Sequence, residues 1–197
     1  MTDAPGDGWA TGDAYEAYMG RWSRPLAGAE ALPRRAGGFD AVVSGLVLNF
    51  LQDPGGAVAS IRERLHPGGT VAAYVWDYRE GMQFLRSFRE EAVASDALDE
   101  GRRFPLCRTP ALASLFRAAG LVQVETDRLE IPTDFASFDD YWTPFLRGTG
   151  PAPSYVATLD PTSLELLRER LRRRLHAETD GRIQLRARAW TVRGVAN

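Results

Sequence analysis

Apolar residues fall into a few short runs along this chain, and the clearest run covers residues 41–48. Its β-branched members Val42, Val43 and Val47 favour an extended backbone, and the turn sequence Asp53-Pro54-Gly55-Gly56 follows soon after it. An apolar run this short, closed by a turn, is typical of a strand that is buried on both faces of a parallel sheet. We therefore predict an inner strand at Phe39–Ser44.

The next segments predict a helix and a second strand. Asp53 caps and Pro54 begins a helix that runs through Leu65, and His66-Pro67-Gly68-Gly69 ends it. Thr70–Trp76 is again apolar and short enough for a buried strand. A strand, a helix and a strand joined by short turns form a right-handed parallel unit, which places Asp77 and Tyr78 at the carboxyl end of the second strand.

The remaining pattern continues the alternation of helices and strands. The aromatic-rich segment 135–146 fits either a helix or a lid, and residues 148–153 a loop. The other predicted elements are helices at 82–98 and 109–120, an extended link at 102–106, strands at 121–131 and 183–192, and a helix that Asp160-Pro161 caps and that continues to Leu175. This order predicts an α/β fold.

Length and composition favour one domain over residues 1–197, because 197 residues with 44% hydrophobic content can bury one core. We expect residues 1–12, rich in Gly, Asp and Thr, to be disordered. Residues 13–27 are expected to form a helix with Tyr15 and Trp22 on one side. That helix is either an amphipathic helix on the core or a lid whose aromatic rings face a ligand.

Charge and cysteine content narrow the class of protein. A net charge of −2 gives no reason to expect nucleic acid or an anionic membrane as a partner. The arginine run at 168–174 is therefore interpreted as a solvated helix face, with a nucleic-acid site as the alternative. A single cysteine, Cys107, suits a reducing cytoplasm, and no apolar stretch approaches the roughly 20 residues that span a bilayer.

Familiar catalytic arrangements are missing from the pattern. No His, Cys, Asp and Glu residues have the spacing of metal ligands, so no metal is expected. Ser44-Gly45 ends a strand without the flanking residues of a hydrolase nucleophile elbow. Cys107 precedes a helix start, where its thiol pKa could be lowered, but no histidine lies near it in sequence, and a structural thiol is the simpler interpretation.

Two motifs at this spacing resemble a known family. Phe39-Asp-Ala-Val-Val-Ser-Gly and the turn Leu65-His-Pro-Gly-Gly-Thr-Val resemble the second half of a class I S-adenosylmethionine-dependent methyltransferase. Tyr15-Glu-Ala-Tyr-Met-Gly-Arg-Trp-Ser-Arg24 looks like the N-terminal helix of members that act on small molecules. The resemblance runs from about Tyr15 to Val195. It implies that the two predicted strands are the fourth and fifth of a seven-stranded sheet.

The sequence also departs from that family. The glycine-rich turn that cradles the methionine part of the cofactor has no counterpart, and neither has the acidic residue that holds the ribose hydroxyls. Two strand–helix units are missing at a junction near Ala27–Gly28, roughly 60–90 residues at about 30 or more per unit. The expected fold is a partial Rossmann-like methyltransferase fold, with residues 28–197 as its C-terminal half. Its mostly parallel sheet corresponds to the last four strands and has helices on both faces.

The resemblance implies which residues hold the ligands. S-adenosylmethionine is the implied cofactor, and the acceptor is a small molecule whose identity the sequence does not specify. The implied cofactor contacts are Ala29, Ser44, Gly45, Leu46, Tyr15 and Trp22. The implied substrate contacts are Trp76, Tyr78, Tyr141 and Trp142, for which core packing is the alternative. No catalytic residue is assigned, because methyl transfer depends mostly on positioning and on excluding water.

Two functions stay open on these grounds. One is methyl transfer to a small molecule, and the other is a non-catalytic remnant that acts as a binding or dimerisation module. An apolar strand at the edge of a sheet invites pairing with another chain. We therefore expect that a homodimer can form through the Phe39–Ser44 edge.

Overall fold

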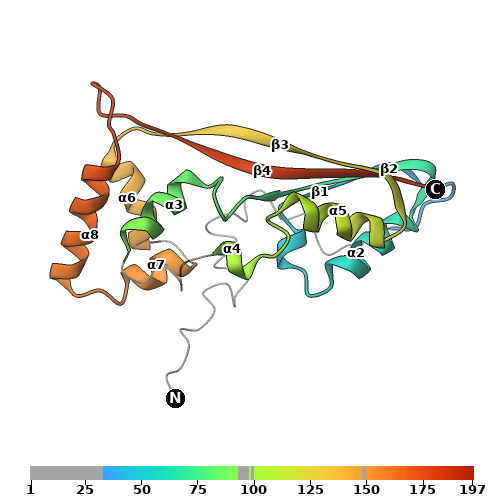
Figure 1. The fold of residues 1–197 in the computed structure, drawn as a ribbon, viewed down its shortest axis with the longest axis horizontal. Coiled ribbons are helices and arrows are strands. Elements are labelled where there is room, and N and C mark those ends of the chain that lie inside the picture. Colours follow the sequence, from blue (N-terminus) through green and yellow to red (C-terminus); the bar gives the residue numbers. More distant parts are fainter. Residues whose placement is uncertain (1–32, 93–97, 99, 148–149) are drawn as a thin grey trace, which may run out of the picture. The chain divides into compact units, whose positions relative to one another are not determined.

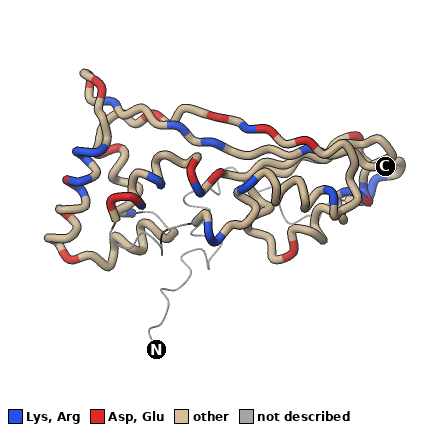
Figure 2. Tube along the Cα trace, in the orientation of Figure 1, with Lys and Arg blue, Asp and Glu red and all other residues tan. Residues whose placement is uncertain are grey.

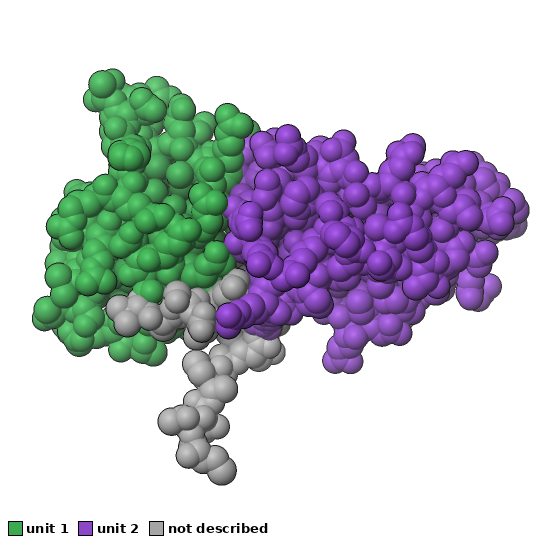
Figure 3. Space-filling model, viewed as in Figure 1, with its two compact units in different colours: residues 1–24, 82–100, 132–186 green, residues 25–81, 101–131, 187–197 purple. Residues whose placement is uncertain are grey.

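The computed structural model describes residues 33–92, 98, 100–147 and 150–197, and these form two compact units (Figure 3). Unit 1 comprises residues 1–24, 82–100 and 132–186, and unit 2 comprises residues 25–81, 101–131 and 187–197. A single domain over 1–197 remains a prediction. The expected disorder at 1–12 and the expected helix at 13–27 lie outside the described residues.

A four-stranded sheet has the order β1-β2-β4-β3 (Figure 1). Its strands are β1 (Phe39–Gly45), β2 (Leu65–Trp76), β3 (Leu121–Phe135) and β4 (Ile183–Ala196). β1 and β2 are parallel, as predicted, whereas β2 and β4 are antiparallel. The α/β class is confirmed, but the mostly parallel sheet is partly wrong, because β4 inserts beside β2 in the opposite direction.

The β1–α2–β2 segment forms the predicted parallel unit. Helix α2 (Pro54–Arg62) begins after Asp53, whose Oδ1 accepts a hydrogen bond from the Gly56 amide at 2.8 Å, and Pro54 occupies the first turn. The helix ends three residues before the predicted Leu65. The Pro-Gly-Gly turn lies within β2, where the pairing shifts register between Phe39↔Leu65 and Ala41↔Thr70.

The prediction that β1 is buried on both faces is wrong. Val43 is 63% exposed and Ala41 is exposed, whereas Ser44 is buried. The physical reason is the position of β1 at the edge of the sheet, with a helix layer on one face. Among the described residues of unit 2, the helices α2 and α5 (Thr109–Ala118) both pack on one face of the sheet, the face on which Ser44 is buried. Helices on both faces are therefore not seen in the described part of unit 2.

The core of unit 2 lies between this helix layer and the sheet. Leu112 and Phe116 of α5 are fully buried. Residues 102–106, predicted as an extended link, instead begin with the short helix α4 (Glu100–Arg103). The other buried residues of this core are Leu48, Val58, Ile61, Leu65, Val71, Ala73, Val75, Leu106, Leu121, Val192 and Ala196.

Unit 1 is built around aromatic side chains. Its helices are α3 (Gln83–Glu91), α6 (Phe138–Arg147), α7 (Pro151–Val156) and α8 (Pro161–Arg174). Most of the 135–146 segment is thus helical, as α6, whereas Phe135 ends β3 (Leu121–Phe135); α7 was not predicted. Asp160 caps α8 as predicted, since its Oδ1 accepts from the amides of Thr162 and Ser163.

The arginine run of α8 lies on its exposed side. Arg168 pairs with Asp139 at 3.0 Å, Arg172 with Glu169 at 3.6 Å, and Arg174 with Glu91 at 3.1 Å. These contacts between opposite charges agree with a solvated helix face. In the part of the chain that the structure describes, no helix has the length and apolar content needed to cross a membrane.

Candidate site at the carboxyl edge of the parallel strands

The carboxyl ends of β1 and β2 meet at one edge of the sheet because the two strands are parallel. β1 ends with buried Ser44 and then Gly45, and the chain bends at Leu46. The Leu46 amide donates to the carbonyl oxygen of Tyr74 at 2.8 Å. Leu46 has φ of +61°, a left-handed conformation that is strained for a residue with a side chain. Crevices outside such strand ends are the usual ligand sites of open α/β sheets.

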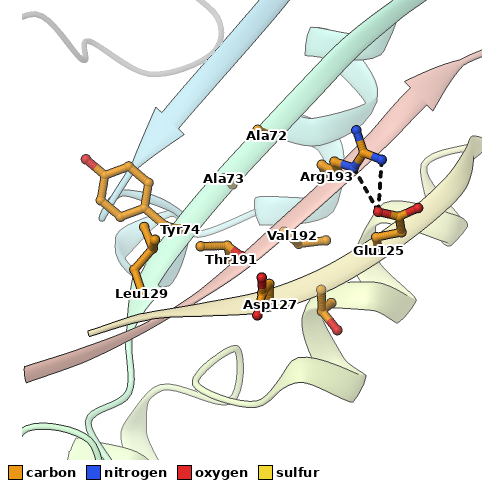
Figure 4. Close-up of a pocket in the computed structure, with 10 residues that line it drawn as sticks. Ala72, Ala73, Tyr74, Glu125, Asp127, Leu129, Thr191, Val192 and Arg193 are labelled. Atoms are coloured by element: carbon orange, nitrogen blue, oxygen red, sulfur yellow. Dashed lines mark hydrogen bonds and ion pairs between the residues drawn. The ribbon is translucent and has the colours of Figure 1, made fainter. Parts of the chain in front are cut away.

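Gly45 lies directly against a neighbouring ring. A Cβ atom at this position would overlap the phenol of Tyr74, which lies across the end of β1 on the face without described helices (Figure 4). The ring therefore occupies the space that a larger residue 45 would need. Tyr74 limits access to the last residue of β1 from this face of the sheet.

The segment after β1 provides an aromatic side chain at the edge. The short 3₁₀ helix η3 (Leu48–Phe50) places Phe50 edge-on against Phe104, with ring centroids 5.1 Å apart. Asn49 Nδ2 lies 3.4 Å from Sγ of Cys107, and Cys107 is 2% exposed. Burial among these groups supports the structural interpretation of the thiol.

The segment after β2 is fixed by a buried ion pair. Asp77 is 2% exposed, and its Oδ2 accepts hydrogen bonds from Nε and Nη2 of Arg188 at 2.9 and 2.6 Å. The Arg188 guanidinium lies over the Trp190 ring at 4.7 Å from the ring centroid. Asp77 Oδ1 also accepts from the amides of Arg79 and Glu80, each at 3.2 Å. Asp77 thus fixes the turn that carries Tyr78.

This turn completes an aromatic wall. The Tyr78 ring lies 5.1 Å from the Phe104 ring, on which Phe50 also packs. Phe104 and Tyr78 are buried, whereas Phe50 is 37% exposed. We call Phe50, Phe104 and Tyr78 the aromatic wall. Of its three rings, only Phe50 exposes planar apolar surface at the carboxyl edge of β1 and β2.

The structure brings only some of the sequence-predicted residues together. Ser44, Gly45, Leu46, Trp76 and Tyr78 all lie at this edge of unit 2. The substrate candidates Tyr141 and Trp142 belong to α6 of unit 1, are 0% and 4% exposed, and pack in its core. The cofactor candidates Tyr15, Trp22 and Ala29 lie outside the described residues.

Sequence reasoning missed Phe50, Phe104 and the role of Arg188. Phe50 lies in the segment that follows the carboxyl end of a predicted strand, which is a usable signal. Phe104 comes from a segment that was predicted to be only a link. Arg188 lies on the strand of alternating residues near the C-terminus, 111 positions from Asp77. No local pattern connects residues that far apart.

A shallow hollow of about 480 Å³ lies on the sheet face without described helices (Figure 4). Tyr74 and Leu129 lie close together at one end, and the ion pair of Arg193 with Glu125 closes the other end. Among the described residues, no three His, Cys, Asp or Glu side chains are placed to hold a metal ion.

Comparison with known protein families gives a match to part of the unit that carries this edge. Residues 22–73 match the family described as "Methyltransferase domain". The matched stretch contains β1, α2 and β2 as far as Ala73. These residues are therefore similar to part of a methyltransferase domain, in agreement with the resemblance of the motifs to a class I S-adenosylmethionine-dependent methyltransferase. A search of curated protein sequences finds no match.

Three solved structures, two from Bacillus species and one from Haemonchus contortus, are among those similar to this chain. A putative methyltransferase from Bacillus halodurans shares 12% identity over 86% of this chain and 75% of its own, with a TM-score of 0.44. YcgJ from Bacillus subtilis shares 15% identity over 95% of this chain and 80% of its own, with a TM-score of 0.46. Phosphoethanolamine N-methyltransferase 2 from Haemonchus contortus, in complex with S-adenosylhomocysteine, shares 13% identity over 86% of this chain and 35% of its own, with a TM-score of 0.41.

Proposed function

We propose that this chain takes part in S-adenosylmethionine-dependent methyl transfer to a small-molecule acceptor in the cytoplasm. The observation that carries the proposal is the methyltransferase-domain match across β1, α2 and most of β2. The carboxyl edge of this same parallel pair is where a ligand crevice is expected.

The residues at this edge fit one side of the cofactor. The backbone at Ser44–Leu46 and the exposed face of Phe50 suit a planar, largely apolar base, because aromatic rings stack on nucleobases. Asp77 is the acidic residue that follows β2 directly, but Arg188 and two backbone amides already occupy its oxygens. It is therefore not available to the ribose hydroxyls. The opposite side would have to come from the proposed contacts Tyr15, Trp22 and Ala29 or from another chain.

S-adenosylmethionine supplies an activated methyl group when it is bound. The work left to the protein is to orient the acceptor and to exclude water. We propose that Tyr78, held by the Asp77 turn, and Trp76 contact the acceptor. We also retain Tyr141 and Trp142 of unit 1 as proposed substrate contacts, although their present contacts are those of core side chains.

A second candidate function is a methyltransferase-like module that no longer transfers methyl groups. The observation that favours it is that the sequence lacks counterparts of the glycine-rich turn and of the acidic residue that hold the cofactor in the family it resembles. Such a module would keep the scaffold of the β1–α2–β2 unit and serve in binding or dimerisation.

Calorimetric titration with S-adenosylmethionine and S-adenosylhomocysteine, combined with thermal unfolding, separates the two functions. Saturable binding is expected, and ligand at 100 times its Kd should raise the free energy of unfolding by about 2.7 kcal/mol. A folded sample that shows neither heat of binding nor a shift in Tm at millimolar ligand would contradict methyl transfer and leave the non-catalytic module.

The variant Phe50→Ala tests the aromatic wall. Removing a ring that stacks on the base is expected to weaken cofactor binding by about 1–3 kcal/mol, roughly 5- to 150-fold in Kd. The matched control is Val122→Ala, another partly exposed apolar residue of unit 2, which is 41% exposed. Both variants should unfold within a few degrees of the wild type. An unchanged Kd in Phe50→Ala would exclude stacking on this ring.

A further inference from the structure

The two edges of the sheet differ in how well they are protected. The order β1-β2-β4-β3 leaves β1 and β3 at opposite edges, and within the described residues β1 pairs with β2 alone. Unpaired strand edges attract other strands, and proteins usually guard them with charges, prolines or irregular backbone.

β3 carries all of these protective features. Its backbone departs from regular strand geometry at Gln123, where φ is +50°, and Pro132 removes an amide donor. Charged residues of both signs also follow one another along its length, at Glu125, Asp127, Arg128, Glu130 and Asp134 (Figure 2). A second strand that approached this edge would meet charges and a missing donor.

β1 has none of these protections over its central part. Asp40 is its one charged residue, and it lies near the start, outside the regular pairing of Ala41–Gly45 with β2. The side chain of Val43, at the middle of this regular stretch, is 63% exposed. The stretch is thus short, uncharged and apolar at its centre.

The backbone of β1 presents its hydrogen-bonding groups in a regular series. The Leu46 amide donates to Tyr74, so it points toward β2. Because strand amides alternate in direction, those of Ser44 and Val42 also point toward β2, and those of Gly45, Val43 and Ala41 point to the open edge. Three alternate residues therefore offer amide and carbonyl groups to an incoming strand.

We propose that this edge binds a second copy of the same chain, β1 to β1 and antiparallel, about a two-fold axis at Val43. This register pairs Val43 with its counterpart and Ala41 with Gly45 of the other copy, and each pair joins residues whose groups point outward. It also places Asp40 opposite Leu46, so the two Asp40 carboxylates lie at opposite ends of the ribbon. The proposal does not depend on methyl transfer.

Charge at the axis tests the proposal. The wild-type chain is expected to sediment as a dimer, and Val43→Lys is expected to raise the dimer Kd by about 100-fold or more, because two like charges would face each other across the axis. Leu129→Lys is the matched control, since Leu129 is 54% exposed on the guarded strand β3. The control should leave the dimer intact, and circular dichroism should show that both variants remain folded.

A cysteine at the axis gives an independent readout. Directly opposed residues of a hydrogen-bonded antiparallel pair have Cα atoms about 5.5 Å apart, within the range that a disulfide spans. Val43→Cys should therefore form a covalent dimer under mild oxidation, whereas Leu129→Cys should not. The native Cys107 is buried and should not compete.

Three results would overturn the proposal. A dimer that survives Val43→Lys would place the interface elsewhere. A monomeric wild type with a freely reactive Val43→Cys thiol would show an open but unpaired edge. A monomeric wild type whose Val43→Cys thiol is protected from labelling would show that the chain covers this edge itself.

Discussion

The buried pair of Asp77 and Arg188 is the strongest single-residue constraint on the candidate site. The Asp77 side chain is 3% exposed, and Arg188 supplies two hydrogen bonds to one of its oxygens. A buried carboxylate that loses its cation keeps its desolvation penalty without compensation. The turn that follows β2 and carries Tyr78 therefore depends on this ion pair.

Replacing the arginine should therefore destabilise unit 2 strongly. Arg188→Met is expected to lower the free energy of unfolding by about 3–5 kcal/mol, measured by urea titration. Arg193→Met, on the same strand, removes an exposed ion pair with Glu125 and should change it by less than about 1 kcal/mol. The double variant Asp77→Asn/Arg188→Met should recover much of the loss; failure to recover would mean that lost packing on Trp190, and not the unpaired charge, causes it.

Residue-level features that depend on near neighbours could be predicted. Asp53 and Asp160 were both assigned as helix caps, because a cap bonds to amides two or three positions ahead. The contact of Phe50 with Phe104 and that of Asp77 with Arg188 join distant segments. Only the folded sheet brings those residues together, so their roles could not be predicted.

At the scale of elements, the turn that leads into β1 sets where the β1–β2 pairing begins. Gly37 and Gly38 have φ of +83° and +80°, and the Gly38 amide donates to Arg35 at 3.0 Å. Gly38 also lies directly against β2, since a Cβ there would approach the His66 amide nitrogen to 2.5 Å. A Cβ at Gly37 would have no neighbour within 4 Å.

These two glycines form a matched pair for mutagenesis. Gly37→Ala should cost about 1–2 kcal/mol, the strain of a left-handed alanine. Gly38→Ala should cost at least about 1 kcal/mol more, because its methyl group also overlaps the backbone of β2. Denaturant midpoints of the two variants measure the difference. Equal midpoints would show that the contact between the turn and β2 is loose.

Element boundaries show where sequence patterns stop being informative. The apolar runs predicted the existence and type of β1, α2, β2, α5, α8 and β4. They did not predict that β2 begins at Leu65, because Pro67-Gly68-Gly69 is typical of a turn and the strand includes it as a register shift. Nor did they show that β1 would be exposed on one face, since an apolar run specifies burial but not which neighbours provide it.

At the scale of the whole chain, two separate cores stabilise the two units. Phe145 is 1% exposed in the aromatic core of unit 1, and Phe116 is fully buried in the core of unit 2. Phe145 stacks on Phe88 and Phe84, at centroid distances of 4.3 and 4.6 Å. The sequence predicted one core over residues 1–197, because no local pattern shows how apolar side chains divide between two cores.

Truncating each phenylalanine should affect its own unit first. Phe145→Ala and Phe116→Ala are each expected to lower the free energy of unfolding by about 3–5 kcal/mol. In native-state hydrogen exchange, Phe145→Ala should reduce protection mainly in α3, α6 and α8, and Phe116→Ala mainly in β1, β2 and α5. Equal loss of protection throughout the chain in both variants would show that the two cores unfold as one cooperative body.

The contrast between β1 and β3 also determines how far assembly could proceed. A strand that pairs with its own copy about a two-fold axis uses the same edge of both chains, so the ribbon is closed after one contact. Growth into a fibre would require the far edge of each sheet, and β3 presents charges and a proline there. The same asymmetry that opens one edge would therefore limit the particle to two chains and protect the cell from filaments of this protein.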